Sequence, residues 1–148
     1  MNATALAFDY NPVLPGRAGF GKAPRSRQSR GRMADLSGRF AEENVALLME
    51  RRGLRVLHRR WRATSGEIDL ICRQGECFVF IEVKKSRSHA EAAQRLNRSQ
   101  QARICNAALE FCASQPGGMT CEMRFDVALV DALGRVELLE NAFGDCFA

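Results

Sequence analysis

Two short apolar segments carry charged residues at the ends that would meet in a hairpin. Glu67 and Asp69 stand near the start of GEIDLICR, and Glu82 and Lys84 stand at the end of ECFVFIEVKK. Both segments are rich in Ile, Val and Phe, and only Gln74-Gly75-Glu76 separates them, a pattern typical of two strands joined by a tight turn. Because alternate side chains share one face of a strand, Glu67 lies on the face of Asp69, and Glu82 on the face of Lys84.

The turn predicts the pairing of the two strands. If Gly75 and Glu76 form a two-residue loop, which favours Gly at its first position, then residue 74 pairs with residue 77. Asp69 then faces Glu82, and Glu67 faces Lys84, with all four at one end of one face. We expect the reverse face to be core, made of Ile68, Leu70, Val79, Ile81 and Val83.

This cluster is suited to phosphodiester hydrolysis. Facing carboxylates such as Asp69 and Glu82 repel each other, and a divalent cation removes that cost. Mg²⁺ is commonly held by one or two carboxylates together with waters and phosphate oxygens, and Lys84 could contact a phosphate oxygen or a metal-bound water. The alternative is a surface ion-pair cluster of Glu67 with Lys84 and Asp69 with Lys85, and the pattern by itself does not decide between the two.

The elements that must position these residues can be read from periodicity and turn residues. Apolar residues at helical spacing, followed by Gly53, predict a helix over 37–52, and a second series predicts a long helix over 88–114. Strands are expected on either side of these helices and in the hairpin, which gives the order α-β-β-β-α-β-β and an α/β fold. Besides the hairpin, the expected strands cover 54–62, 122–130 and 135–143.

Charge and composition divide the chain. The 148 residues fit one domain over 37–148, and residues 1–36 are expected to form a basic, disordered tail, with Met33 as an alternative natural start. Residues 33–103 hold 14 basic and 9 acidic side chains, whereas residues 104–148 hold 2 and 7. This asymmetry favours an acidic partner such as nucleic acid for the part with the charged cluster.

Cellular location is suggested by what the sequence lacks. No apolar run is long enough for a membrane helix, and the first residues do not resemble a secretory signal. The six cysteines form no CxxC pair, and neither His58 nor His89 stands at ligand spacing from them. We therefore expect reduced cysteines in the core and a cytoplasmic protein.

Several longer strings carry a resemblance to a known family. GEIDLI at 66–71, FIEVK at 80–84, Arg124-Phe125-Asp126 and Asn141-Ala142-Phe143 are the most specific of them. Over about residues 37–143 the chain resembles the YraN family, bacterial predicted nucleases of the PD-(D/E)xK superfamily that are similar to archaeal Holliday-junction resolvases. The resemblance implies a restriction-endonuclease-like fold, with a central mixed sheet flanked by helices.

The resemblance also implies roles for individual residues. Asp69 and Glu82 become ligands of Mg²⁺ or Mn²⁺, and Lys84 orients or activates the attacking water. Glu42 matches an acidic residue that can reach the metal in resolvase-like relatives, and Glu67 also enters as a candidate. For both of these glutamates, an ordinary surface role stays open. Asp126 could pair with Arg124 or line the site, and we favour a structural role for it.

Two departures from the family touch candidate phosphate contacts. Many members have Lys-Thr-Arg where this chain has Lys84-Lys85-Ser86-Arg87, and a lysine is usual at the position aligned with Gln100. Trp61 is expected to pack in the core. Further candidates for phosphate contacts are Arg59, Arg60, Arg62, Arg95, Arg98 and Arg103.

The expected function is a metal-dependent nucleic-acid phosphodiesterase, in particular a structure-preferring DNA endonuclease, with a homodimer as a possible assembly. One alternative is a non-catalytic nucleic-acid-binding module on a nuclease fold. Another is an interaction protein whose acidic C-terminal part, with Glu137, Glu140 and Asp145, docks a basic partner.

Overall fold

A computed structural model describes residues 26–143 and shows a five-stranded mixed sheet of order β1-β2-β3-β4-β5. Only β3 and β4 run parallel, and the other neighbours pair antiparallel. The fold class is therefore α/β, as expected. The strands are β1 (Arg55–Arg62), β2 (Glu67–Gln74), β3 (Cys77–Lys85), β4 (Glu122–Val130) and β5 (Val136–Leu139).

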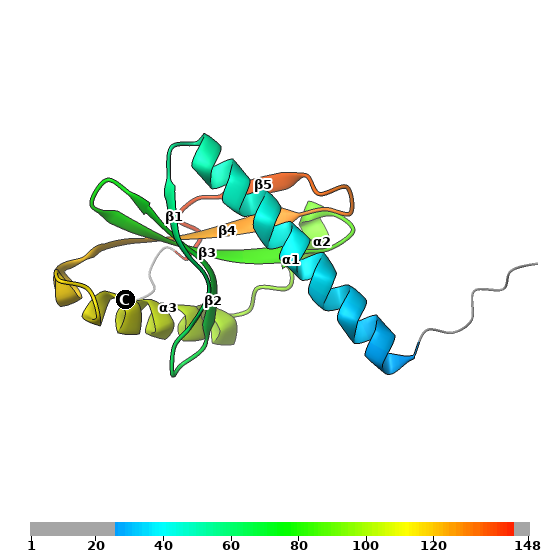
Figure 1. Ribbon diagram of the computed structural model, residues 1–148, viewed down its shortest axis with the longest axis horizontal. Helices are drawn as coiled ribbons and strands as arrows, with labels where there is room; N and C mark the ends of the chain where they lie inside the picture. The colour runs from blue at the N-terminus through cyan, green and yellow to red at the C-terminus, as the bar shows by residue number, and fades with distance from the viewer. Residues whose placement is uncertain (1–25, 144–148) are drawn as a thin grey trace, which may run out of the picture.

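Helices cover both faces of this sheet. Helix α1 (Arg27–Arg51) packs on one face and buries Val45 and Met49 against alternate strand residues such as Val79. On the other face, α3 (Arg98–Ala113) buries Phe111 against the intervening strand residues, including Phe80. In Figure 1, α1 crosses the sheet diagonally and its first turns extend past the strands. The short helices α2 (His89–Ala93) and η1 (Gly118–Thr120) flank α3 along the chain.

The first helix is longer than predicted. It begins at Arg27, after the Ser26 cap, rather than near Ser37, so residues 27–36 are helical and not part of an irregular tail. The first turns of this extension are polar and exposed, and so carry no apolar period by which the sequence could predict them. The rest of the predicted tail, residues 1–25, lies outside the described residues.

The predicted helix over 88–114 is wrong as a single element, because the chain forms two helices there. Ser88 caps α2 by accepting a hydrogen bond from the Glu91 amide, and Asn97 caps α3 by accepting one from the Gln100 amide. The Asn97 cap therefore starts a new helix within the segment whose apolar residues recur at helical spacing. The last strand is also shorter than the predicted 135–143, and Asn141 follows it with a left-handed φ of 51°.

The hairpin register is confirmed, but one core assignment is not. Gln74 pairs with Cys77 and Leu70 with Ile81, around a turn in which Gly75 has a φ of 59°. Ile68, expected on the face of Leu70, instead packs in the cluster under α3, whereas Leu70 packs under α1. The alternation of side chains is thus broken at Asp69.

The neighbouring strand, β1, is irregular at Arg60, opposite Asp69. Arg60 has a φ of 48°, and the flanking pairs are Arg59 with Leu70 and Trp61 with Ile68. A non-glycine residue in this conformation marks a departure from regular strand geometry. Trp61 itself packs edge-on against Phe111, in agreement with the predicted core role.

The cysteines agree only in part with the expectation of reduced thiols. Cys72, Cys77, Cys112 and Cys121 are free, but Cys105 is disulfide-bonded, so that expectation is wrong for Cys105. Cys146 lies outside the described residues. Within residues 26–143, no helix has the length and apolar character needed to cross a membrane.

Candidate active site

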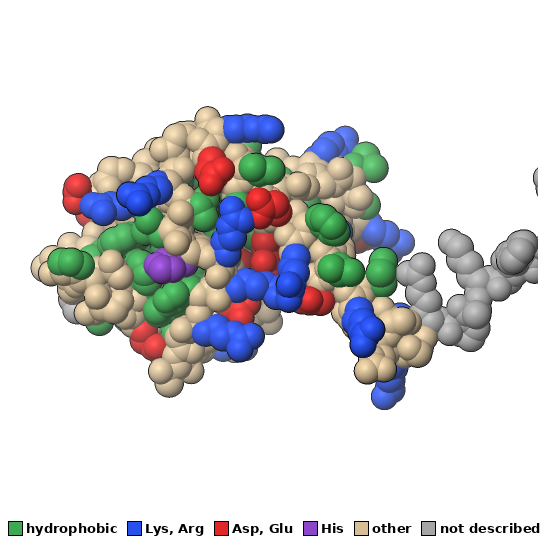
Figure 2. All heavy atoms as spheres, viewed as in Figure 1, with side chains coloured by type: hydrophobic (Ala, Val, Ile, Leu, Met, Phe, Trp, Pro, Cys, Tyr) green, Lys and Arg blue, Asp and Glu red, His purple; other side chains and the backbone are tan. Residues whose placement is uncertain are grey.

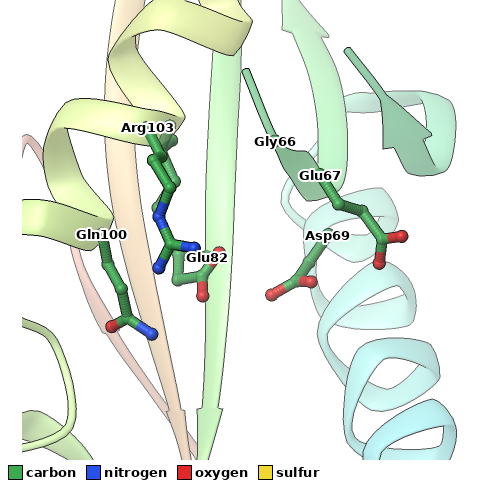
Figure 3. A pocket seen from close by; sticks show the side chains of 7 residues that line it. Gly66, Glu67, Asp69, Glu82, Gln100 and Arg103 are labelled. Atoms are coloured by element: carbon green, nitrogen blue, oxygen red, sulfur yellow. The ribbon is translucent and has the colours of Figure 1, made fainter. Parts of the chain in front are cut away.

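A pocket of about 230 Å³ opens between the ends of β2 and β3 and the first turns of α3 (Figure 3). It brings three of the predicted carboxylates together with side chains of α3 that lie far along the sequence. Its lining residues are Gly66, Glu67, Asp69, Glu82, Gln100, Arg103 and Ile104.

Asp69 has the most strongly perturbed carboxyl group of this pocket. Burial, together with the negative charge of Glu82, raises the pKa of Asp69 to about 8. A hydrogen bond between the two carboxyl groups acts in the same direction. The Val83 amide donates to Asp69 Oδ2 over 2.8 Å and opposes the shift only in part. The predicted proximity of Asp69 and Glu82 is therefore present.

Lys84 completes the predicted trio. Its Nζ lies 2.8 Å from Glu82 Oε1, and each of the two side chains is only 13% exposed. Lys84 and Glu82 stand two residues apart on β3 and so share a face of the strand. A largely buried ammonium group thus lies directly beside Glu82, although Lys84 is not among the residues that line the pocket.

The ion pairs that the surface alternative predicted are not those in the structure. Glu67 pairs with Arg62, whose Nε lies 3.2 Å from Glu67 Oε2, and not with Lys84. Lys85 Nζ donates to the Ser37 hydroxyl, and Asp69 accepts from the Val83 backbone. Glu67, Asp69 and Lys85 therefore have different partners from those predicted, and the cluster does not consist of two surface ion pairs.

Of the two further candidate glutamates, Glu67 lines the pocket and Glu42 does not. Glu67 lines the pocket from its more exposed side. Glu42 comes from α1 and does not line it, although its charge contributes to the raised pKa of Asp69. Its carboxylate is held by Arg60, with 3.0 Å between Arg60 Nε and Glu42 Oε2. The structure thus brings Glu42 near Asp69 with its charge already engaged.

The donor set fits a hard divalent cation. The raised pKa of Asp69 means that this carboxyl group keeps its proton at neutral pH, and a cation bound between Asp69 and Glu82 could replace that proton. Among residues 26–143, no group of three or more His, Cys, Asp or Glu side chains is gathered for a metal. A cation here would therefore take two carboxylates from the protein and its remaining ligands from water or phosphate, as Mg²⁺ commonly does.

Two polar side chains of α3 form the opposite wall, and both point into the pocket in Figure 3. Gln100 Oε1 is buried and accepts no hydrogen bond within the part of the chain that the structure describes. Arg103 lies one helical turn further on and lines the same pocket as Glu82. Gln100 is a departure from the family pattern and Arg103 a predicted phosphate contact, but the prediction did not place them in one pocket. Their spacing of three residues, on the helical face of Ile104, is the signal that could have done so.

Glu110 is a supporting residue that sequence analysis missed. It accepts hydrogen bonds from the amides of Thr64 (2.7 Å) and Ser65 (3.0 Å) and from the Ser65 hydroxyl (2.6 Å), and these bonds lower the pKa of Glu110. It thereby ties the β1–β2 loop to α3, beside the point where Gly66 approaches Arg103. No local motif marks such a contact between distant segments.

All three predicted phosphate-contacting arginines on β1 already have acidic partners. Arg59 pairs with Glu43, Arg60 with Glu42, and Arg62 with Glu67. Figure 2 shows this mixture, with Asp and Glu side chains lying among Lys and Arg side chains on the face that α1 crosses.

Asp126 has the expected structural role. It is fully buried, binds Arg124 over 2.9 Å and accepts a hydrogen bond from the Asn141 amide. This contact joins the middle of β4 to the segment after β5.

Comparisons with known proteins agree on one family. Residues 41–130 match the model of UPF0102, described as an uncharacterised protein family. A UPF0102 protein of Cereibacter sphaeroides (strain ATCC 17029) is 58% identical over 113 residues, which cover 76% of this chain and 97% of that protein. A UPF0102 protein of Ruegeria pomeroyi is 53% identical, covering 78% and 94%, respectively. The chain therefore belongs to the UPF0102 family, to which the YraN-like proteins that it resembles correspond.

Proposed function

We propose that the protein is a metal-dependent phosphodiesterase that acts on nucleic acid, built on a restriction-endonuclease-like fold of the PD-(D/E)xK superfamily. The observation that carries the proposal is the contact of Asp69, with its raised pKa, to Glu82, which is in turn bound by Lys84. Two adjacent carboxylates that line one pocket, with a shielded lysine bound to one of them, are the groups that such hydrolysis requires.

Each residue of the pocket has a distinct task in this proposal. Asp69 and Glu82 would hold Mg²⁺ or Mn²⁺, which would supply positive charge to neutralise the phosphate and to favour ionisation of water. Lys84 lies against Glu82, where its ammonium group can orient the attacking water and stabilise negative charge that builds on phosphorus. The attacking water would form a new P–O bond in line as the P–O bond to the leaving oxygen breaks; the water gives up a proton to solvent and the leaving oxygen takes one up, so the products are a phosphate monoester and an alcohol.

The α3 wall supplies the contacts to substrate. The Arg103 guanidinium can bind the non-bridging oxygens of the phosphate at the pocket, since bidentate phosphate binding suits arginine. Gln100 Oε1, buried without a donor in the described chain, is placed to accept a hydrogen bond from a water molecule. Arg103 has no acidic partner among the ion pairs of residues 26–143, unlike the arginines of β1.

DNA is the substrate we favour. The resemblance to resolvase-like nucleases supports an endonuclease with a preference for branched or nicked DNA. The net positive charge of residues 33–103 supports a polyanionic substrate in general.

A second candidate function is nucleic-acid binding without cleavage. The neutral Gln100 in the pocket wall favours it, because relatives usually place a lysine there and the loss of this charge weakens phosphate binding. This candidate predicts binding that depends on salt but no hydrolysis in any divalent cation.

Cleavage of branched and linear DNA in Mg²⁺ or Mn²⁺ separates the two candidates. We expect cleavage that EDTA abolishes and that the Lys84→Ala variant loses while it still binds DNA. The matched control is Glu76→Gln, in the exposed hairpin turn at the other end of β3, which should cleave normally. Binding without cleavage by the wild type, or undiminished cleavage by Lys84→Ala, would contradict the proposed hydrolysis.

A further inference from the structure

A second cavity, of about 420 Å³, lies over the end of β3 and shares no lining residue with the pocket of Asp69. It is bounded by α1 through Ser37 and by the segment after α2 through Arg95. The residues that line it are Ser37, Lys85, Ser86, Arg87, Glu91, Arg95 and Ala132.

The cavity is adjacent to the candidate active site along β3. Lys84 lies beside Glu82 in the active-site pocket, and the next residue, Lys85, lines the second cavity. Successive side chains of a strand point to opposite faces of the sheet. The end of β3 therefore presents one cation toward the carboxylates and the next toward α1, where Lys85 contacts Ser37.

The charge of the second cavity is positive, and most of its donors are uncommitted. Lys85, Arg87 and Arg95 face a single carboxylate, Glu91. Glu91 already accepts a hydrogen bond from the Ser86 hydroxyl over 2.9 Å, and its contact with Arg87 is long, at 3.8 Å. The Arg87 side chain is 89% exposed, so this ion pair restrains it little.

Arg95 is fixed in place without being neutralised. Its Nη1 donates to the Lys85 carbonyl oxygen over 3.0 Å, which uses one of the five N–H donors of a guanidinium group. The backbone contact positions the charge at the rim of the cavity and leaves donors for an anion. A fixed guanidinium beside a lysine and serine hydroxyls is a favourable setting for a phosphate group.

We propose that this cavity binds a second backbone phosphate of the same nucleic-acid strand that occupies the active-site pocket. The inference rests on the proposed function, because it assumes that a phosphodiester lies at Asp69 and Glu82. A nucleic-acid backbone carries phosphates in series, so one strand that passes over the end of β3 can occupy both places. The substrate is then a polynucleotide held at two phosphates, and small diesters use the active-site pocket alone.

The test compares a double substitution with a matched control. Arg87→Ala/Arg95→Ala removes two charges from the cavity. Arg51→Ala/Arg55→Ala removes two exposed arginines that line neither site, near the hairpin-turn end of the sheet. Binding of a fluorescein-labelled 20-base DNA to the full chain is measured by anisotropy, in Ca²⁺, across a range of salt concentrations. Hydrolysis of bis(p-nitrophenyl) phosphate in Mn²⁺ is measured in parallel.

We expect the cavity variant to bind DNA about tenfold more weakly, with a salt slope smaller by about one to two, while hydrolysis of the small diester is unchanged. The control should keep most of its affinity. The single variant Arg87→Ala, altered only at an exposed side chain, should show the same trend and guards against misfolding of the double variant.

Equal affinities and slopes for the cavity variant and the wild type would overturn the proposal, as would an equal loss in the control. Polyglutamate binding, measured by the same method, is a further check. If the cavity variant loses polyglutamate binding while its DNA binding is unchanged, the proposal is overturned and the cavity is assigned to an acidic protein segment. If no protein hydrolyses either substrate, the proposed catalysis fails, whereas the anisotropy measurement still decides whether this cavity binds phosphate.

Discussion

Asp69 combines burial with two neighbouring carboxylates, and this environment makes its ionisation unfavourable. Its pKa of about 8 in the folded protein lies above the value of 3.8 for a solvated side chain. The folded state therefore binds a proton that the unfolded state has lost, so the free energy of unfolding falls as pH rises from about 4 through 8. A divalent cation would reverse this loss by pairing with the ionised form.

Asp69→Asn should stabilise the metal-free protein at alkaline pH. The neutral amide can still accept the hydrogen bond from the Val83 amide, but it carries no charge to be repelled by Glu82. We expect a Tm about 5 °C above wild type at pH 9 and little difference at pH 4, measured by thermal denaturation in EDTA. A Tm difference that does not vary with pH would contradict the assigned environment of Asp69.

At the scale of elements, the pocket depends on contacts between segments far apart in the chain. The β1–β2 loop reaches α3 through Glu110, and the breaks in strand alternation at Arg60 and Asp69 set which residues face α3. Both features orient Glu67 and Asp69 relative to Gln100 and Arg103. The loop contact and the breaks in alternation thus arise from the packing of several elements together, and not from any single helix or strand.

Replacing Glu110 should loosen the loop without unfolding the sheet. Glu110→Ala leaves the amides of Thr64 and Ser65 without their acceptor, so their hydrogen exchange should accelerate about tenfold or more, with a Tm lower by only a few degrees. Glu122→Ala, at an exposed position at the start of β4, serves as the control. Unchanged exchange at Thr64 and Ser65 would show that Glu110 does not hold the loop.

The elements could be predicted from the sequence to different degrees, for physical reasons. The hairpin and β4 have continuous apolar runs, so their bounds and the pairing of Gln74 with Cys77 follow from pattern and turn chemistry. The predicted helix over 88–114 is divided at the Asn97 cap, and a prediction from apolar periodicity alone does not detect this cap. The predicted face of Ile68 is wrong because the alternation of side chains between the two faces of β2 breaks at Asp69. No local sequence pattern indicates this break.

The candidate site shows the same limit. The proximity of Asp69, Glu82 and Lys84 could be predicted because all three lie on one hairpin. The wall formed by Gln100 and Arg103 and the Glu110 anchor could not be, because they depend on how α3 lies across the sheet.

At the scale of the whole molecule, charge is divided between the two parts of the chain. Residues 33–103 are net basic and supply every lining residue of the two cavities except Ile104 and Ala132, while residues 104–148 are net acidic. Several basic side chains of the first part are paired with acidic ones, whereas Arg103 and Arg95 take part in no ion pair among residues 26–143, and Arg87 is 89% exposed beside Glu91. Such cations at both cavities would favour binding of a polyanion along a path that joins them.

Adding one cation on this path should strengthen nucleic-acid binding measurably. Gln100→Lys places a positive charge in the pocket wall, so we expect a steeper dependence of DNA affinity on salt, by about one in the log–log slope, measured by anisotropy in Ca²⁺. Gln115→Lys, near the other end of α3, is the control with the same change of charge. An equal gain for both variants would show that the pocket wall does not contact phosphate.

The rate of DNA cleavage by wild type and by Asp69→Asn, at equal protein concentration in Mn²⁺, tests the central claim most directly. Asp69→Asn is expected to fold at least as well as the wild type, so a lost rate reports on chemistry and not on stability. We predict a rate lower by about a hundredfold or more, with Glu76→Gln unchanged. Cleavage by Asp69→Asn at the wild-type rate would contradict the assignment of this pocket as the active site.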